Sequence, residues 1–90
     1  MVNKKGKTMK RPRVRLQVRV AEVIRRYREA GKWTQDAFAA HIEMHRAQYS
    51  IMEEGRKDVR LSTLERVANG LQVPMWVILR EAEDPNSRDS

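Results

Sequence analysis

The sequence has no cysteine among its 90 residues, and glycine (four), proline (three) and aromatic side chains (6%) are sparse. Without thiols, neither a disulfide framework nor a thiolate metal site can form, so a reducing, cytoplasmic setting is expected. No apolar run approaches the roughly 20 residues that a membrane-spanning helix needs, and the basic start lacks the apolar stretch of a secretory signal. We therefore expect a small protein without a membrane partner.

Motifs typical of enzymes are missing as well. The sequence has no glycine-rich phosphate loop, nucleophile elbow or acid–base set of the kinds that known catalytic mechanisms use. His41 and His45 flank Glu43, but the order His-Ile-Glu-Met-His lacks the His-Glu opening of a zinc-protease motif, and a turn here would separate the two histidines. We therefore expect a binding protein that is not an enzyme and that uses neither a metal nor a cofactor.

Positive charge is abundant but unevenly distributed. The net charge is +7, which suggests a polyanionic partner. Residues 1–19 hold eight of the 19 basic residues and none of the 12 acidic ones. The rest of the chain is therefore close to neutral, and it must recognise a polyanion by the placement of individual charges.

Apolar periodicity and helix-end signals predict an all-α fold of five short helices. Thr34 is placed as an N-cap, Gly55 suits the left-handed position after a helix end, and Ser62 with Glu65 has the form of a capping box. The expected helices run from Gln17 or Val20 to Ala30, from Thr34 to about Ile42, from Ala47 to Glu54, from Ser62 to Leu71, and from Met75 to about Arg80.

The start of the first helix has a competing interpretation. Residues 14–20 alternate apolar and polar side chains as a short strand does, whereas the apolar residues from Leu16 to Tyr27 also follow helical spacing. We favour the helix and keep the strand as the alternative. The expected organisation is a flexible basic arm at residues 1–15, a helical domain at residues 16–82 and a disordered tail at residues 83–90.

A pattern of residues along the central part of the chain resembles the phage-repressor and Cro-like helix-turn-helix family. The matching residues are Thr34-Gln35-Asp36-Ala37-Phe38-Ala39, then Ile42, Met44, Arg46, Ser50, Met52, Glu53 and Gly55, and finally Leu61, Leu64, Ala68, Leu71 and Val73. The resemblance covers about residues 20–79. It implies a compact five-helix, lambda-repressor-like DNA-binding domain, in which a short third helix enters the major groove.

The resemblance also implies contacts between individual residues and DNA. Residues at the family's groove-facing positions are expected to touch bases: Arg46, Ala47, Ser50 and Ile51. Gln48 matches a neighbouring position, from which it is expected to reach a flanking base or the DNA backbone. Arginine can bind guanine with two hydrogen bonds, while alanine and isoleucine can pack against a thymine methyl group. Expected phosphate contacts are Thr34 and Gln35, Arg56, Lys57 and Arg60 in the loop after the third helix, and Lys10, Arg11 and Arg13 in the arm.

Other matching positions are structural. The resemblance implies an ion pair between Arg28 and Glu53, on the first and third helices. Ala39 is expected where the second and third helices cross, because a larger side chain would push them apart. The core beneath these two helices is expected to contain Phe38, Ile42, Met44 and Met52.

Three positions depart from the family pattern. Glu43 stands where a glycine of positive φ is usual, which is unfavourable by about 1 kcal/mol. Tyr49 replaces a branched aliphatic residue, so its ring needs more room and its hydroxyl needs a partner or an exit to solvent. Gly70 replaces an alanine, which is expected to weaken the fourth helix by about 1 kcal/mol. These departures affect the expected docking geometry more than the expected fold.

Residues 75–79 form an apolar cluster that is larger than one helix face can bury. The resemblance implies a homodimer formed through Trp76, Val77, Ile78 and Leu79, and a two-fold dimer would bind a palindromic operator. We therefore expect a sequence-specific transcriptional regulator of double-stranded DNA, acting as a repressor or autoregulator. The alternative is the antitoxin of a toxin–antitoxin pair, which would cover a toxin with the same surface.

Overall fold

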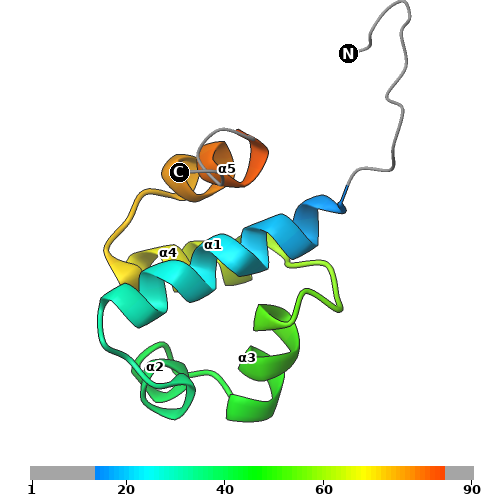
Figure 1. Ribbon diagram of the computed structural model, residues 1–90. Helices are drawn as coiled ribbons and strands as arrows, with labels where there is room; N and C mark the ends of the chain where they lie inside the picture. Colours follow the sequence, from blue (N-terminus) through cyan, green and yellow to red (C-terminus); the bar gives the residue numbers. More distant parts are fainter. Residues whose placement is uncertain (1–13, 85–90) are drawn as a thin grey trace, which may run out of the picture.

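The computed structural model describes residues 14–84, and five α-helices account for most of them (Figure 1). The helices are α1 (Leu16–Ala30), α2 (Gln35–His41), α3 (Arg46–Glu53), α4 (Leu61–Leu71) and α5 (Met75–Glu83). The all-α, five-helix prediction is confirmed. Most of the expected arm and of the expected C-terminal tail lies outside the described residues. None of the five helices is both long enough and apolar enough to cross a membrane.

α1 begins earlier than the sequence indicated. The amide of Val18 donates to the carbonyl of Arg15 (3.0 Å), so the chain is already helical within the segment of alternating pattern. The strand interpretation of that segment is wrong, because Val20 belongs to a helical stripe that continues through Ile24 and is buried in the core. Leu16, one turn before Val20, is the first residue of α1 and is 40% exposed.

α1 runs through the middle of the molecule and contacts helices on both sides (Figure 1). α5 packs on one side, where the Arg19 Nη1 donates to the carbonyl of Ala82 (2.9 Å) and the Tyr27 hydroxyl donates to Glu81 (2.7 Å). α2 and α3 lie on the opposite side, and α4 lies beside α1. α2 and α3 therefore form a pair on one face of the molecule.

The core contains residues from all five helices. Its buried members are Val20, Val23, Ile24, Phe38, Ala39, Ile42, Tyr49, Met52, Leu64, Val67, Ala68, Ile78 and Ala82, with Met44 partly buried against them. The predicted core beneath α2 and α3 is confirmed. Because several of these side chains are fully buried, their removal from water is a large favourable term in folding.

Two small residues set how closely the helices approach. Ala39 is 1% exposed in α2, as expected for a residue beneath a helix crossing. At Gly70 of α4, an added Cβ would come within 2.4 Å of the Ile42 Cγ2 and within 3.2 Å of the Phe38 ring. Helix propensity alone is therefore a misleading guide to Gly70, because the close approach of α4 to the α2 side leaves no room for a methyl group.

The helix ends follow the sequence signals in most places. The Thr34 Oγ1 accepts a hydrogen bond from the amide of Ala37 (3.0 Å), and Gly55 has a φ of 74°, so both predictions are confirmed. The capping box predicted at Ser62 is wrong. The amide of Leu64 donates to the carbonyl of Arg60 (2.8 Å), so the N-cap of α4 is Arg60, two residues before Ser62, and Ser62 lies inside the helix.

The turn between α2 and α3 forms without the usual glycine. Glu43 has a φ of 58°, which is the left-handed conformation that the family's glycine supplies. The amide of Glu43 donates to the carbonyl of Ala40 (3.1 Å), and the amide of Met44 donates to the carbonyl of Ala39 (2.8 Å). The strain at Glu43 is thus tolerated, and α3 begins directly afterwards at Arg46.

Candidate nucleic-acid interface

α3 has one exposed face and one buried face. Arg46, Ala47 and Gln48 are exposed at its N-terminal end, while Ser50 and Ile51 are half-buried. On the opposite face, Tyr49, Met52 and Glu53 are buried. The predicted base-contacting residues therefore share the accessible face of α3, although the last two offer less surface than the first three.

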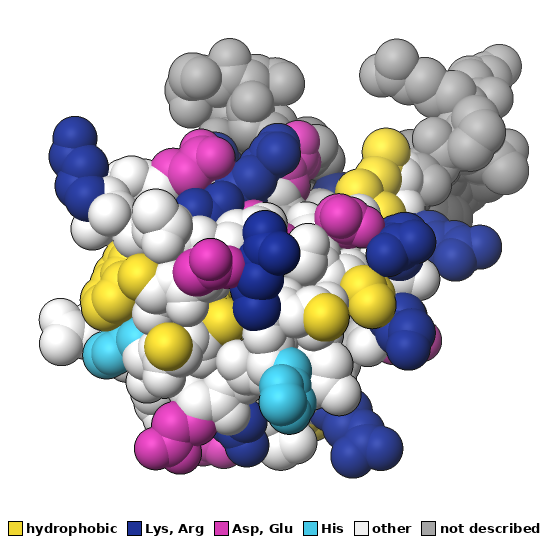
Figure 2. All heavy atoms as spheres, turned by 90° about the horizontal axis from the view of Figure 1, so that it is seen from below, with side chains coloured by type: hydrophobic (Ala, Val, Ile, Leu, Met, Phe, Trp, Pro, Cys, Tyr) yellow, Lys and Arg dark blue, Asp and Glu magenta, His cyan; other side chains and the backbone are white. Residues whose placement is uncertain are grey.

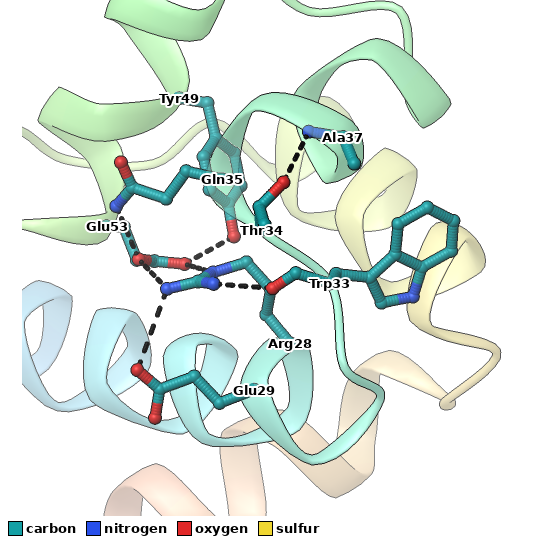
Figure 3. A network of polar contacts seen from close by, with 8 residues as sticks. All are labelled: Arg28, Glu29, Trp33, Thr34, Gln35, Ala37, Tyr49 and Glu53. Carbon is teal, nitrogen blue, oxygen red and sulfur yellow. Dashed lines mark hydrogen bonds and ion pairs between the residues drawn. The ribbon is translucent and has the colours of Figure 1, made fainter.

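The carboxylate of Glu53 is the centre of a buried polar network (Figure 3). Arg28 binds it with two hydrogen bonds, from Nε to Oε2 (2.7 Å) and from Nη2 to Oε1 (2.9 Å). The Tyr49 hydroxyl donates to Oε2 (2.5 Å), and the Gln35 Nε2 donates to Oε1 (2.8 Å). The expected Arg28–Glu53 ion pair is confirmed, and it connects α1 to α3.

Tyr49 and Gln35 make this network larger than the sequence indicated. The Tyr49 ring is fully buried and packs edge-on against Phe38, with ring centroids 5.5 Å apart. Its hydroxyl finds its partner in Glu53, which lies one helical turn later in α3. The departure at Tyr49 is therefore accommodated inside the core, and it adds a hydrogen bond that an aliphatic residue cannot make.

The network changes the pKa values of its members. Burial alone would raise the pKa of the Glu53 carboxyl, but hydrogen bonds from Arg28, Tyr49 and Gln35 outweigh burial and lower it below the usual value. Burial, followed by the hydrogen bond to Glu53, raises the pKa of the Tyr49 hydroxyl. The carboxylate is thus charged and the hydroxyl protonated at neutral pH, so each donor in the network keeps its acceptor.

The start of α2 lies close to the accessible face of α3. Thr34 is exposed, and its hydroxyl can still donate a hydrogen bond outward while its oxygen caps the helix. Gln35 is half-buried with one amide hydrogen directed to Glu53, which leaves the second available for an acceptor such as phosphate. Both residues occupy positions compatible with the predicted phosphate contacts.

Arg46 makes a contact that the sequence did not reveal. Its Nε lies 2.5 Å from the Oδ1 of Asp36 in α2, and both side chains are largely exposed, at 65% and 74%. The family resemblance includes Asp36 but implies no contact for its side chain. Only the relative placement of α2 and α3 brings these two residues together.

The loop between α3 and α4 borders a groove of about 470 Å³. Gln48 and Ile51 line it from α3, and Lys57 and Arg60 line it from the loop. Arg56, Lys57 and Arg60 are exposed, and the Arg56 Nε lies 2.8 Å from the Oε1 of Glu54. The structure therefore places the predicted loop cations near α3, and the positive charge of Arg56 is partly neutralised by Glu54.

Charge on the α2–α3 side of the molecule is dispersed. Figure 2 looks at this side and shows separate Lys and Arg side chains interspersed with acidic ones. This pattern agrees with the near-neutral charge of the chain after residue 19. Lys10, Arg11 and Arg13, which were predicted to contact phosphates, lie outside the described residues.

The apolar cluster in α5 is divided between the core and the surface. Ile78 is fully buried, so it is not available to a second protomer, and its prediction as a dimer residue is wrong. Trp76 is 63% exposed, with the Arg80 guanidinium 5.5 Å from the centre of its ring. Val77 and Leu79 are half-buried on either side of Ile78. Successive residues of α5 point in different directions around the helix axis, so Ile78 packs in the core while Trp76 faces solvent.

The two histidines considered as metal ligands lie in different surroundings. His41 ends α2 and stacks on the ring of Trp33, with centroids 4.6 Å apart, while His45 precedes α3. Within residues 14–84, no three His, Asp or Glu side chains gather in an arrangement that could hold a metal ion.

Comparison with known proteins agrees with this geometry. A family model described as a helix-turn-helix domain matches residues 19–81. The control protein C.MunI of a Mycoplasma species is 34% identical over 50 residues, which are 56% of this chain and 68% of that protein.

The fold also resembles solved structures of the clp gene regulator ClgR from Corynebacterium glutamicum. One of them has a TM-score of 0.74 at 24% identity and covers 78% of this chain and 91% of its own. Another has a TM-score of 0.75 at 25% identity and covers 79% of this chain and 76% of its own. The chain belongs to the helix-turn-helix domain family, and it is a DNA-binding transcriptional regulator of that family.

Proposed function

We propose that this protein binds a specific palindromic operator as a homodimer, with α3 of each protomer in the major groove, and that it regulates transcription as a repressor or autoregulator. The observation that carries the proposal is the division of α3 into a buried, hydrogen-bonded face and an exposed face that starts with Arg46, Ala47 and Gln48. A helix supported in this way can enter a groove without losing its packing. Binding without catalysis is part of the proposal.

Base recognition follows from the chemistry of the exposed face. Arg46 can donate two hydrogen bonds to the O6 and N7 of guanine, and Gln48 can bind adenine or a flanking base. Ala47 can contact a thymine methyl group, and the half-buried Ser50 and Ile51 would add contacts deeper along the helix. Arg46 is therefore the residue expected to contribute most to sequence preference.

Phosphate contacts would fix the position of α3 on the duplex. Thr34 and Gln35 lie on one side of α3, and the loop cations Lys57 and Arg60 lie on the other. Two DNA strands border the major groove, so contacts on both sides of α3 are what docking requires. Arg56 would also contact a phosphate if its ion pair with Glu54 is replaced by one with DNA.

The proposed dimer surface is the exposed part of α5. Trp76 presents most of its side chain to solvent, and Val77 and Leu79 add partly exposed apolar surface. A large aromatic residue exposed beside apolar neighbours is typical of a protein–protein contact. A two-fold dimer through α5 would present two copies of α3 to half-sites about one helical turn apart. The names of the relatives, a control protein and a gene regulator, support a regulatory role.

Selection of bound sequences from a random pool of double-stranded DNA tests the proposal. The expected result is a palindromic consensus, together with a solution mass of two chains. Arg46→Ala should then relax the preference at one base pair in each half-site, by about 1 to 3 kcal/mol. Binding without any consensus, or a strict monomer that still selects a palindrome, would contradict the proposed mode of recognition.

The exposed Trp76 also favours the second candidate, an antitoxin that covers a partner toxin with α5. Co-expression with genomic neighbours distinguishes the two. The homodimer proposal expects a mass of two identical chains in the presence of neighbouring gene products. A stable complex with one of these products, lost on Trp76→Ala, would favour the antitoxin.

A further inference from the structure

Two neighbouring residues at the start of α2 contact opposite ends of α3. Gln35 donates to Glu53 at the C-terminal end (2.8 Å), and Asp36 pairs with Arg46 at the N-terminal end (2.5 Å). Arg46 and Glu53 are seven residues apart, or about two helical turns, so Arg46 lies at the edge of the exposed face of α3 that borders the buried side with Glu53. The first turn of α2 therefore contacts both ends of α3.

The two contacts differ in whether they leave hydrogen-bonding groups accessible to a ligand. The carboxylate of Glu53 is buried and receives all its partners from inside the protein. In the outer pair, the Oδ1 of Asp36 lies beside the Nε of Arg46 as an ion-pair partner, and within residues 14–84 no acceptor is bonded to either Nη atom. The Arg46 side chain is 65% exposed, so much of it is accessible to a ligand. The Nη atoms are groups with which arginine can bind the O6 and N7 of guanine.

We propose that Asp36 is a positioning residue that orients Arg46 for guanine and thereby sets sequence preference at one base pair. The inference rests on the proposed function of α3. A free arginine side chain loses rotational freedom when it binds a base, and a carboxylate that already holds the Nε lowers this loss. Asp36 thus favours the specific complex, in which the guanidinium keeps one orientation.

The charge of Asp36 supports the same conclusion. A carboxylate near the phosphates is repelled by them, so Asp36 weakens binding to every sequence alike. An exposed ion pair also contributes little to the stability of the free protein. A contact that lowers general affinity and stabilises the fold only weakly has its main effect on discrimination, because it restrains the arginine from turning toward the nearest phosphate.

The test compares four variants with the wild-type protein: Asp36→Asn, Glu43→Gln, Arg46→Ala and the double variant Asp36→Asn with Arg46→Ala. Glu43 is the matched control, because it is an exposed acidic residue in the turn before α3 and makes no side-chain contact with Arg46 within the described residues. Affinities are measured for the selected operator, for operators changed at single base pairs, and for unrelated DNA, at two salt concentrations.

Both charge-removing variants should bind unrelated DNA more tightly than the wild type. Only Asp36→Asn should also lose preference at the base pair that Arg46→Ala relaxes, by about three- to tenfold. In the double variant, the Asp36 substitution should cause no further loss at that base pair. Thermal unfolding of each variant confirms that the comparison is made between folded proteins.

The outcomes separate this inference from the proposed function. Equal base-pair profiles for Asp36→Asn and Glu43→Gln would overturn the positioning role while leaving operator binding intact. An equal loss for every sequence in Asp36→Asn would overturn it as well, since Asp36 would then act through the fold. A wild-type protein without any sequence preference would remove the proposed function itself, and the inference with it.

Discussion

α3 carries an arginine–carboxylate pair at each end, and the two pairs differ sharply in burial. In the inner pair, the side chains of Arg28 and Glu53 are 9% and 2% exposed, and Tyr49 and Gln35 complete the shell of donors. In the outer pair, Arg46 and Asp36 are 65% and 74% exposed. The same kind of ion pair therefore has two roles. The inner pair fixes α3 to α1, and the outer pair orients the Arg46 side chain toward a DNA base, as proposed above.

Removing half of the inner pair should have the largest effect on stability. Arg28→Ala leaves the buried carboxylate of Glu53 without its main partner, which typically destabilises a protein by about 3 to 5 kcal/mol. Because domains of this size are only marginally stable, the variant should be largely unfolded at moderate temperature. Chemical denaturation followed by circular dichroism measures the loss. A loss below about 1 kcal/mol would show that the carboxylate is well solvated.

Acid should weaken the inner pair by protonating the Glu53 carboxylate. The folded-state pKa of the Glu53 carboxyl is lowered, so its stabilising effect is present above the unfolded pKa, about 4.3, and is lost as the pH falls through the folded value. Tyr49→Phe removes one of the hydrogen bonds that lower this pKa, so the variant should be less stable at neutral pH and should unfold at a higher pH than the wild type.

Thermal unfolding measured from pH 7 to pH 2 tests this prediction for Tyr49→Phe. The expected curves for the wild type and Tyr49→Phe differ most at neutral pH and converge in acid, where the carboxyl is protonated in both. Parallel curves across the whole range would mean that the Tyr49 hydroxyl does not act through the charge of Glu53.

A smaller loss is expected from Gly70→Ala, which alters the packing beneath α2 without touching either pair. The new methyl group would overlap the Cγ2 of Ile42, a buried and branched side chain that cannot turn away freely. Overpacking of this kind destabilises by about 1 to 3 kcal/mol, and the better helix propensity of alanine offsets about 1 kcal/mol of it. A net loss of about 1 kcal/mol in denaturation is expected, and a more stable variant would contradict the packing argument.

The sequence predicts the inner region of the molecule better than the outer one. The Thr34 cap, the left-handed Gly55 and the Arg28–Glu53 pair are confirmed, because each depends on local conformation or on residues matching a family pattern. The capping box at Ser62 is wrong, because the carbonyl of Arg60 already accepts from the amide of Leu64 and places Ser62 inside the first turn of α4.

The contacts that the sequence missed depend on how the helices are placed relative to one another. Asp36 and Arg46 are separated by a turn, and no periodicity indicates that their side chains meet. The inward rotation of Ile78 and the lack of space at Gly70 likewise follow from the angles at which α5 and α4 pack. These are properties of three-dimensional packing that a one-dimensional pattern does not contain.

The smallest stability effect is expected from breaking the outer pair. Asp36→Asn should change the unfolding free energy by less than about 1 kcal/mol, because exposed ion pairs are screened by water and salt. Part of even this change should come from the position of Asp36 in the first turn of α2, where a negative charge interacts favourably with the helix dipole. Asp36→Asn and Arg46→Ala should therefore couple weakly in denaturation of the free protein but clearly in operator binding. Strong coupling in the free protein would mean that the outer pair, like the inner one, holds the fold together.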